Sequence, residues 1–335
     1  MKRILVTGGC GFIGSHFVRR MLTRHAGLEV VNLDALTYAG NPRNLEDVAD
    51  DPRYRFVHGS IADRDAVADA ADGCDVIVNF AAETHVDRSI HAGYEFVTSN
   101  VIGPMTLLAF VREHGGRMVH VSTDEVYGDI EPGEASKETD QLRPSSPYSA
   151  AKAGGDLQVL ASVRTYDVDA LITRGSNTYG PYQYPEKMIP LFTTNLLDGQ
   201  PVPVYGDGRQ ARDFIWVEDH CAGIELVLEK GATGETYNVG GGHEIENLET
   251  TRRLLELTGR DESFVTHVTD RLGHDRRYAL DCSKLRALGW APETSFAEGL
   301  GRTVSWYSER RDWWEPIKRG EVFESYSARQ YGSRA

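Results

Sequence analysis

The stretch TGGCGFIG, residues 7–14, decides the fold of this chain. It lies between the apolar run ILVTG (4–8) and an amphipathic segment over residues 12–24. Glycines in such a strand-to-helix turn allow a tight bend and let the backbone approach a pyrophosphate at the helix N-terminus. The turn therefore predicts a dinucleotide-binding unit, and the glycines that would form it are Gly8, Gly11 and Gly14.

Short β-rich runs alternate with helical patterns through the first half of the chain. Alternating βα units predict an α/β fold with a Rossmann-type, doubly wound parallel sheet, in which ligands bind outside the carboxyl ends of the strands. The strands are predicted at residues 4–8, 30–34, 56–60, 75–82, 118–122 and 170–174. The helices are predicted at residues 12–24, 63–71, 94–114 and 147–166.

The second half of the chain has a different local composition, because residues 176–190 and 200–214 are rich in Gly, Pro and Tyr. Such segments are typical of loops that shape a binding site. A late β-rich run, 235–240, would return to the main sheet, whereas the tail from residue 321 has no clear period and is expected to be partly mobile. The predicted domains are a dinucleotide-binding domain over 1–175, with return segments near 213–241, and a smaller, interleaved C-terminal substrate domain, mainly 176–335.

Composition excludes several classes of function. A net charge of −14 argues against a nucleic-acid-binding surface. No apolar run reaches the roughly 18 residues of a membrane span, and the N-terminus lacks the cleavage site of a signal peptide. The four cysteines are far apart and show no CxxC spacing, so we expect reduced thiols, a cytoplasmic protein and no metal site.

Asp34 ends the second predicted strand, 20 residues after Gly14. At this position an acid can bind a ribose 2′-hydroxyl and would repel a 2′-phosphate, so the chain is predicted to bind NAD rather than NADP. The alternative is that Asp34 only caps a turn.

Tyr148 and Lys152, in YSAAK, would share one face of a helix that begins at Ser146 and Pro147. A lysine cation near the phenol, helped by the positive charge of a nicotinamide, is expected to lower the tyrosine pKa from its usual value of about 10. The tyrosine could then take a proton from a carbinol as hydride leaves. The alternative is an ordinary surface Tyr–Lys pair.

The segment HVSTDEVYG, residues 120–128, places the hydroxyl of Thr123 before two adjacent acids, Asp124 and Glu125. Such a pair could simply lie in a solvated loop or at a helix N-terminus. Tyr148 and Lys152 suffice to oxidise an alcohol, however, so the acids suggest additional chemistry. Once C4 of a hexose is a ketone, a base at C5 and an acid at O6 would expel water. Both acids can reach one pocket only if the strand ends before them.

Over nearly its whole length the sequence resembles the dTDP-glucose 4,6-dehydratases, which are extended short-chain dehydrogenases. STDEVYG combined with YxxxK separates these dehydratases from the related 4-epimerases. The motifs that carry the resemblance are TGGCGFIGSHFVR, DALTYAGN, FAAETHVDRSI, VSTDEVYG, SPYSAAKAGGD, YGPYQYPEKMIPLF, YGDGRQARDF and RLGHDRRYALD.

The resemblance implies that Asp124 is the acid at O6, Glu125 the base at C5 and Tyr148 the base at C4, supported by Thr123 and Lys152. The cofactor contacts it implies, with the glycine turn included, are Gly8, Gly11, Phe12, Ile13, Gly14, Asp34, Ala35, Thr37, Ser60, Ile61, Ala81, Ala82, Ser99, Tyr148 and Lys152. The substrate contacts it implies are Thr84, Thr123, Asn177, Lys187, Pro203, Tyr205, Arg212, Asn247, Arg271 and His274.

The activity implied is NAD-dependent oxidation of dTDP-glucose at C4, elimination of water across C5–C6 and hydride return to C6. The resemblance also implies a homodimer, paired through the helices at 94–114 and 147–166. A UDP-sugar dehydratase and a nucleotide-sugar 4-epimerase remain alternatives, and a non-catalytic NAD-binding protein is disfavoured by the intact acid–base set. Positions that depart from the family pattern are Ser60, Thr178, Gln210 and Phe214.

Overall fold

A computed structural model of the chain describes residues 1–90 and 93–331. Its centre is a seven-stranded sheet in the order β10-β6-β5-β4-β1-β2-β3, in which every pair of neighbours is parallel. The strand order reverses between β1 and β4, which is the switch point where α/β proteins bind ligands. The strands are β1 Arg3–Thr7, β2 Glu29–Asp34, β3 Tyr54–His58, β4 Val76–Asn79, β5 Arg117–Thr123, β6 Ala170–Gly175 and β10 Thr236–Val239.

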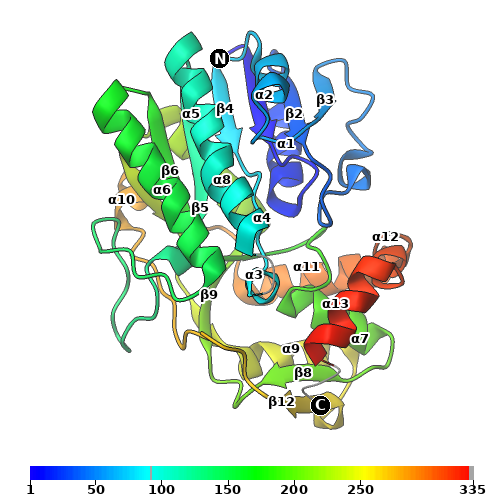
Figure 1. Cartoon of the computed structure of the whole chain (residues 1–335). Coiled ribbons are helices and arrows are strands. Elements are labelled where there is room, and N and C mark those ends of the chain that lie inside the picture. Colours follow the sequence, from blue (N-terminus) through cyan, green and yellow to red (C-terminus); the bar gives the residue numbers. More distant parts are fainter. Residues whose placement is uncertain (91–92, 332–335) are drawn as a thin grey trace.

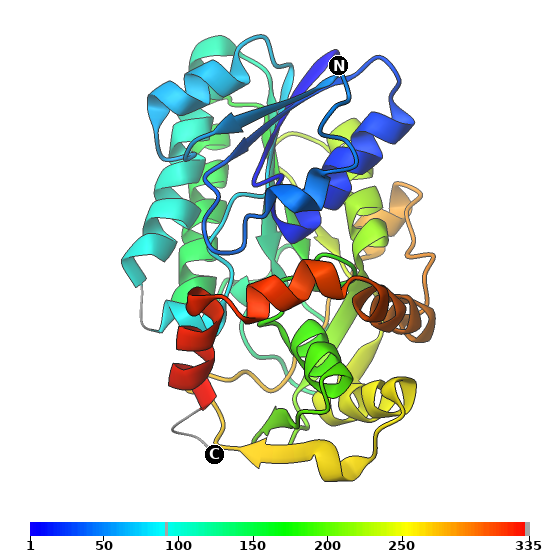
Figure 2. The same ribbon diagram turned by 90° about the vertical axis from the view of Figure 1, so that its right-hand side faces the viewer.

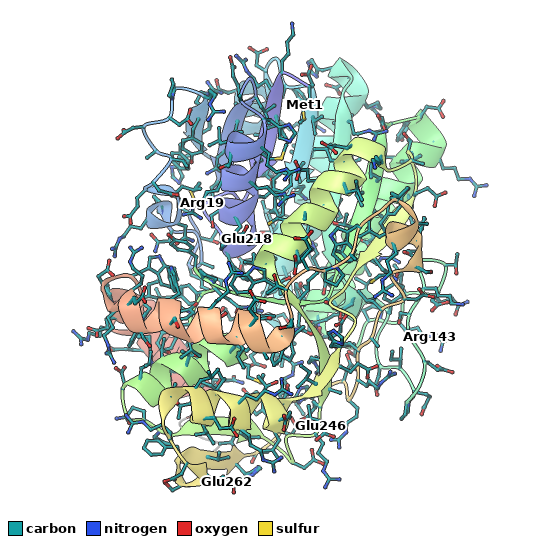
Figure 3. All side chains as sticks on the ribbon, turned by 180° about the vertical axis from the view of Figure 1, so that it is seen from behind. Met1, Arg19, Arg143, Glu218, Glu246 and Glu262 are labelled. Carbon is teal, nitrogen blue, oxygen red and sulfur yellow. The ribbon has the colours of Figure 1, made fainter. Side chains whose placement is uncertain are left out.

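Both faces of this sheet are buried, as expected for parallel strands with helices on each side. In β1, Ile4 and Val6 pack into the hydrophobic core under α1 and α8, and Leu5 packs into the core under α2, α5 and α6. Figure 1 shows α5 and α6 side by side on one face, and Figure 3 shows α1 and α8 on the other. These helices are α1 Phe12–Arg24, α2 Arg64–Ala71, α5 Gly103–His114, α6 Pro147–Tyr166 and α8 Val217–Lys230.

A second layer lies at the carboxyl ends of these strands, built around two small sheets with the orders β11-β9-β7 and β12-β8. Its strands are β7 Asn177–Tyr179, β8 Val202–Tyr205, β9 Ala211–Trp216, β11 Glu244–Glu246 and β12 Val265–Val268. Its helices are α7 Met188–Leu197, α9 Asn247–Thr258, α11 Phe296–Glu309, α12 Arg311–Lys318 and α13 Glu321–Tyr331. The helix α10 Ser283–Ala287 packs instead against β10 of the main sheet. The short elements are η1 Pro42–Leu45, α3 Val86–Ser89, α4 Gly93–Val97, η2 Thr98–Ile102, η3 Asp124–Val126 and η4 Glu262–Phe264.

The chain crosses between the two layers more than once. After the first crossing at Gly175, α8 and β10 return to the main sheet, where β10 pairs with β6. This return supports the proposed interleaved division of the chain near residue 175.

The predicted helix at residues 94–114 is confirmed in extent, but it is not a regular α-helix throughout. A π-helical turn over Thr98–Ile102 lies between α4 and α5 without breaking the helical backbone. Pro104 follows this turn, and a proline ring clashes with the carbonyl four residues earlier, here that of Asn100. The Asn100 side chain accepts a hydrogen bond from the Glu83 amide and donates one to the Glu83 carbonyl, in the loop after β4.

Residues 321–331, in which the sequence shows no clear period, form the helix α13. The expected mobility of the tail stays a prediction. Phe323, Tyr326 and Gln330 are buried, so the helix is held by packing rather than by a periodic sequence. Figures 1 and 2 show α13, in red, running toward β8 and β12. The rest of the tail lies outside the described residues. Within residues 1–90 and 93–331, no helix is both long and apolar enough to cross a membrane.

Candidate active site

The acid pair follows the end of β5. The strand ends at Thr123, and the next three residues form the 3-10 turn η3, Asp124–Val126. Thr123 caps this turn, because its Oγ1 accepts a hydrogen bond from the Glu125 amide at 3.3 Å. The strand therefore ends before the acids, and both carboxyl groups line the same cavity.

The side chain of Asp124 is in an environment that favours its protonated form. It is only 3% exposed, and its Oδ1 accepts a hydrogen bond from Thr123 Oγ1 at 3.1 Å. Its Oδ2 has no hydrogen-bond partner among residues 1–90 and 93–331. Burial, and then the charges of Glu125 and Asp213, raise the pKa of Asp124 well above its usual value. A carboxyl group with a raised pKa beside a second carboxylate provides a proton donor next to a proton acceptor.

Tyr148 and Lys152 lie in the first turns of α6. Its N-terminus is fixed by a capping box between Ser146 and Ser149, with Pro147 in the first turn. The Tyr148 hydroxyl is hydrogen-bonded to Thr123, which brings the tyrosine next to the acid pair.

The predicted lowering of the Tyr148 pKa depends on Lys152 together with the positive charge of a bound nicotinamide, and it stays a prediction. Burial first, and then the charge of Glu125, raise the pKa of Tyr148 well above its usual value. Lys152 Nζ donates a hydrogen bond to the Val121 carbonyl at 2.7 Å. Burial also lowers the pKa of Lys152 itself to about 8.

The glycine turn is shaped for a pyrophosphate. Gly8 has a φ of +68°, and a Cβ there would lie 2.7 Å from the Ala81 amide nitrogen. A Cβ on Gly14 would lie 2.3 Å from the Gly8 carbonyl oxygen. No side chain of the described residues caps the N-terminus of α1, whose first turn also carries no acid. Its amide groups are therefore left for an anionic ligand, so the residues present fit a dinucleotide.

Asp34 lines the same cavity and also caps a turn, as the alternative interpretation predicts. Its carboxylate accepts hydrogen bonds from the amides of Cys10, at 2.9 Å, and Leu36, at 2.8 Å. These bonds tie the glycine turn to the loop after β2 while the carboxylate stays at the cavity wall.

All of the cofactor contacts implied by the sequence lie on this one cavity, which has a volume of about 290 Å³. Thr84, Thr123, Asn177 and Lys187, from the set of substrate contacts, line it as well. Their roles stay predictions.

A second cavity, of about 180 Å³, is lined by residues of the smaller layer. Glu125, Asn177 and Lys187 line both cavities, so Glu125 lies where the two meet, and Asp124 lines the first cavity beside it. The remaining substrate contacts implied by the sequence all line this second cavity: Pro203, Tyr205, Arg212, Asn247, Arg271 and His274.

The second cavity is lined by three basic side chains, Lys187, Arg212 and Arg271, and by three acids, Asp87, Glu125 and Glu186. Arg212 is buried and bonds only backbone carbonyls, and it forms no ion pair within the described part of the chain. Arg271 Nη1 lies 3.7 Å from Asp87 Oδ1, and its Nε has no hydrogen-bond partner in the described ranges. Lys187 Nζ donates to the Thr84 carbonyl at 2.8 Å. Two arginines and a lysine with spare donors suit a diphosphate.

The four departures from the family pattern have local roles. Thr178 Oγ1 lies 2.8 Å from His220 Nδ1, and Gln210 Nε2 donates to Asp270 at 2.9 Å. Phe214 stacks on a neighbouring phenylalanine and lines the second cavity, whereas Ser60 lines the first. None of the four contacts the acid pair in these hydrogen bonds and ring contacts.

Sequence reasoning missed several residues of the cavity walls. His85 and Asp87 belong to the same motif as Thr84, and Glu186 directly precedes Lys187. Their nearness in sequence to predicted contacts could therefore have identified them as cavity residues. Tyr331 lies in the aperiodic tail, where the sequence offered none. The cavity-lining residues missed are Glu83, His85, Asp87, Glu186 and Tyr331.

Comparisons with known proteins identify the family of the chain. A model of the GDP-mannose 4,6 dehydratase family matches residues 5–303. The chain is 53% identical over 322 residues to the dTDP-glucose 4,6-dehydratase of Streptomyces niveus, with 94% of this chain and 96% of that protein covered.

Two solved structures, one of a dehydratase and one of an epimerase, resemble this chain to different degrees. DesIV, a dTDP-glucose 4,6-dehydratase from Streptomyces venezuelae with NAD and TYD bound, is 55% identical, with a TM-score of 0.92 over 94% of this chain and 100% of that chain. The UDP-glucose 4-epimerase of Thermus thermophilus, in complex with NAD, is 32% identical, with a TM-score of 0.85 over 92% of this chain and 99% of that chain. The epimerase shares the fold, but the two dehydratases named above are identical to this chain at more than half of the aligned residues, and the chain belongs to the dTDP-glucose 4,6-dehydratase family.

Proposed function

We propose that this protein is an NAD-dependent dTDP-glucose 4,6-dehydratase that produces dTDP-4-keto-6-deoxyglucose. The observation that carries the proposal is the Asp124–Glu125 pair directly after β5, hydrogen-bonded through Thr123 to Tyr148. NAD, when bound, supplies the acceptor and later the donor of a hydride. Gly8, Gly14 and the uncapped start of α1 would hold its pyrophosphate, and Asp34 its adenosine ribose.

The chain's own residues would then act in sequence. Tyr148 takes the proton of the C4 hydroxyl while Thr123 holds the oxygen, so that C4 becomes a ketone as its hydride leaves. Glu125 next removes the C5 proton, which the adjacent ketone acidifies. Asp124 gives its proton to the C6 hydroxyl, and water departs, leaving a C5–C6 double bond conjugated to the ketone. When hydride returns to C6, a proton from Glu125 restores C5.

The second cavity supports a nucleotide-diphosphate sugar as the substrate. Arg212, Arg271 and Lys187 are placed to bind the diphosphate, and Tyr205 offers a ring on which a base can stack. The sugar would then extend toward Glu125, which lines both cavities.

Incubation of the purified protein with dTDP-glucose, and separately with UDP-glucose, tests the proposal by the mass of the product. A dehydratase yields a product lighter than the substrate by one water, whereas a 4-epimerase leaves the mass unchanged. Faster conversion of UDP-glucose would assign the chain to the UDP-linked dehydratases. A product of unchanged mass would contradict the proposal.

We also propose that the protein is a cytoplasmic homodimer. Each of its four cysteines is a free thiol, which suits a reducing compartment. Large apolar side chains are exposed on the adjacent helices α4, α5 and α6 and on η2, where they would be covered by a second copy. The residues of this apolar face are Tyr94, Val97, Ile102, Met105, Leu157 and Tyr166.

A further inference from the structure

Asp87, on the single turn α3, joins three segments that are far apart in the sequence. It is only 5% exposed and lines the second cavity. Its Oδ2 accepts hydrogen bonds from the hydroxyls of Tyr205, at 3.1 Å, and Tyr326, at 3.4 Å. Its Oδ1 lies 3.7 Å from Arg271 Nη1. One carboxylate therefore contacts β8, α13 and the loop after β12.

Two of these three partners belong to the proposed nucleotide site, since Tyr205 is placed for the base and Arg271 for the diphosphate. The Tyr205 hydroxyl is held from a second side, because Gln330 Nε2 on α13 lies within hydrogen-bond distance at 2.6 Å. The ring of Tyr331 is nearly parallel to that of Tyr205, with 25° between the planes and 6.3 Å between the centroids. Asp87 and α13 together thus fix the orientation of the Tyr205 ring.

We propose that Asp87 is a positioning residue for nucleotide binding, which holds Tyr205 and Arg271 in register with each other and with α13. The inference rests on the proposed function, because it assigns Asp87 to the nucleotide end of that same site. Asp87 contacts Tyr205, Tyr326 and Arg271 rather than the acid pair, so it acts on nucleotide binding and not on the reacting carbons.

A purely structural role, in which Asp87 only anchors α13, predicts different behaviour. Burying a carboxylate is costly, and well-packed apolar residues usually anchor a helix as well or better. The Oδ1 atom also has no hydrogen-bond partner in the described part of the chain, and Arg271 at 3.7 Å is its nearest ionic contact. A carboxylate left incompletely satisfied beside a cavity is better explained by a cation that it shares with a ligand.

The variant Asp87→Asn keeps the size of the side chain but removes its charge. We expect the KM for dTDP-glucose to rise about 10-fold, the loss typical of a hydrogen bond to a charged group, while kcat changes less than about 2-fold. The split follows because the nucleotide end is bound equally in the ground state and the transition state. The Kd of dTDP alone, measured by calorimetry on the NAD-loaded enzyme, should rise by the same factor.

Tyr205→Phe removes the same hydrogen bond from its other end. In that background, Asp87→Asn should weaken dTDP binding by clearly less than in the wild type, because the two single changes share one interaction. Asp219→Asn is the matched control, since Asp219 is also a buried aspartate but bonds the Thr294 amide at 2.9 Å, away from both cavities. It should leave the Kd of dTDP unchanged.

Several results would overturn the proposal. One is an unchanged Kd for dTDP in Asp87→Asn, whatever happens to its melting temperature. Another is that the effects of Asp87→Asn and Tyr205→Phe on the free energy of dTDP binding are fully additive. If Asp87→Asn does not fold, Tyr205→Phe and Tyr326→Phe decide: Tyr205→Phe should weaken dTDP binding more than Tyr326→Phe, and equal effects would contradict the role. Failure of the proposed function is separately visible, since the wild-type protein would then neither bind dTDP nor dehydrate dTDP-glucose.

Discussion

The hydroxyl of Thr123 donates a hydrogen bond to Asp124 Oδ1 at 3.1 Å and is also hydrogen-bonded to the hydroxyl of Tyr148. One side chain thus connects the residue proposed to start the reaction at C4 with the residue proposed to expel water at C6. The connection depends on the chain leaving β5 at Thr123, because neighbouring residues of a continued strand would point to opposite faces.

Tyr148→Phe removes the proposed base for C4 while keeping the ring and its packing. We expect turnover to fall about 100- to 10,000-fold, the usual effect of losing a general base. Because the first hydride transfer is then blocked, no rise in reduced-nicotinamide absorbance should follow addition of substrate. A variant that is folded, binds dTDP and still reduces its NAD rapidly would contradict this role.

NAD should stay bound through each turnover, because the same cofactor accepts hydride from C4 and returns it to C6. Deuterium placed at C4 of the substrate should therefore appear at C6 of the product, within the same molecule. A mixture of doubly labelled and unlabelled substrates, analysed by mass spectrometry, checks this. Crossover of deuterium between the two would show that the cofactor or its hydride exchanges.

The homodimer is tested by charging the apolar face. Leu157→Glu alters an exposed side chain of α6, so the fold of each subunit should survive while association weakens. Leu257→Glu, on the exposed part of α9, is the matched control outside this face. Light scattering at micromolar concentration should give twice the chain mass for the wild type and the control, and a lower mass for Leu157→Glu. A monomeric wild type would refute the dimer.

Acid should destabilise the fold partly through His220, a buried histidine beside the cofactor cavity. Burial lowers its pKa to about 4, whereas an unfolded histidine has a pKa of about 6.5. Between these two values the unfolded state binds more protons, so the free energy of unfolding decreases as the pH falls through this window, by up to roughly 3 kcal/mol. In urea titrations, His220→Gln should show a shallower loss of stability between pH 7 and pH 4. Equal slopes for the two proteins would exclude the contribution of His220.

Local spacing allowed much of the site to be predicted. Gly8, Gly11 and Gly14 take their meaning from a turn of a few residues, and Tyr148 and Lys152 from one turn of a helix. The strands of the main sheet followed from apolar runs, because parallel strands are buried on both faces. The resemblance supplied the remaining contacts, and each of them lines one of the two cavities.

Long-range packing could not be predicted in the same way. Asp87, Tyr205, Arg271 and Tyr326 meet only because α3, β8, the loop after β12 and α13 converge in the folded chain. The helix α13 has no clear apolar period and is held by tertiary contacts, which override local propensity. The pKa of Tyr148 also depends on packing, because the direction of the Lys152 side chain and the burial of both groups are not fixed by their spacing in the sequence.

The acid pair gives the sharpest prediction, since oxidation and elimination should be separable steps. Glu125→Gln keeps the shape of the side chain but removes the proposed C5 base, while Tyr148 and Lys152 remain. This variant should still reduce its NAD on adding dTDP-glucose and then stall at the 4-ketose, so stopped-flow absorbance should show reduced nicotinamide that decays about 100- to 10,000-fold more slowly than in the wild type.

Asp124→Asn should stall in the same way, because hydroxide leaves poorly without a proton donor. The wild-type elimination should also slow as the pH rises through the raised pKa of Asp124, since its proton is then lost before it can be donated. In Asp124→Asn this loss of rate with rising pH should disappear from the elimination step, which a merely structural role would not produce. If Glu125→Gln turns over at the wild-type rate, or binds substrate without reducing any NAD, the elimination does not belong to this pair.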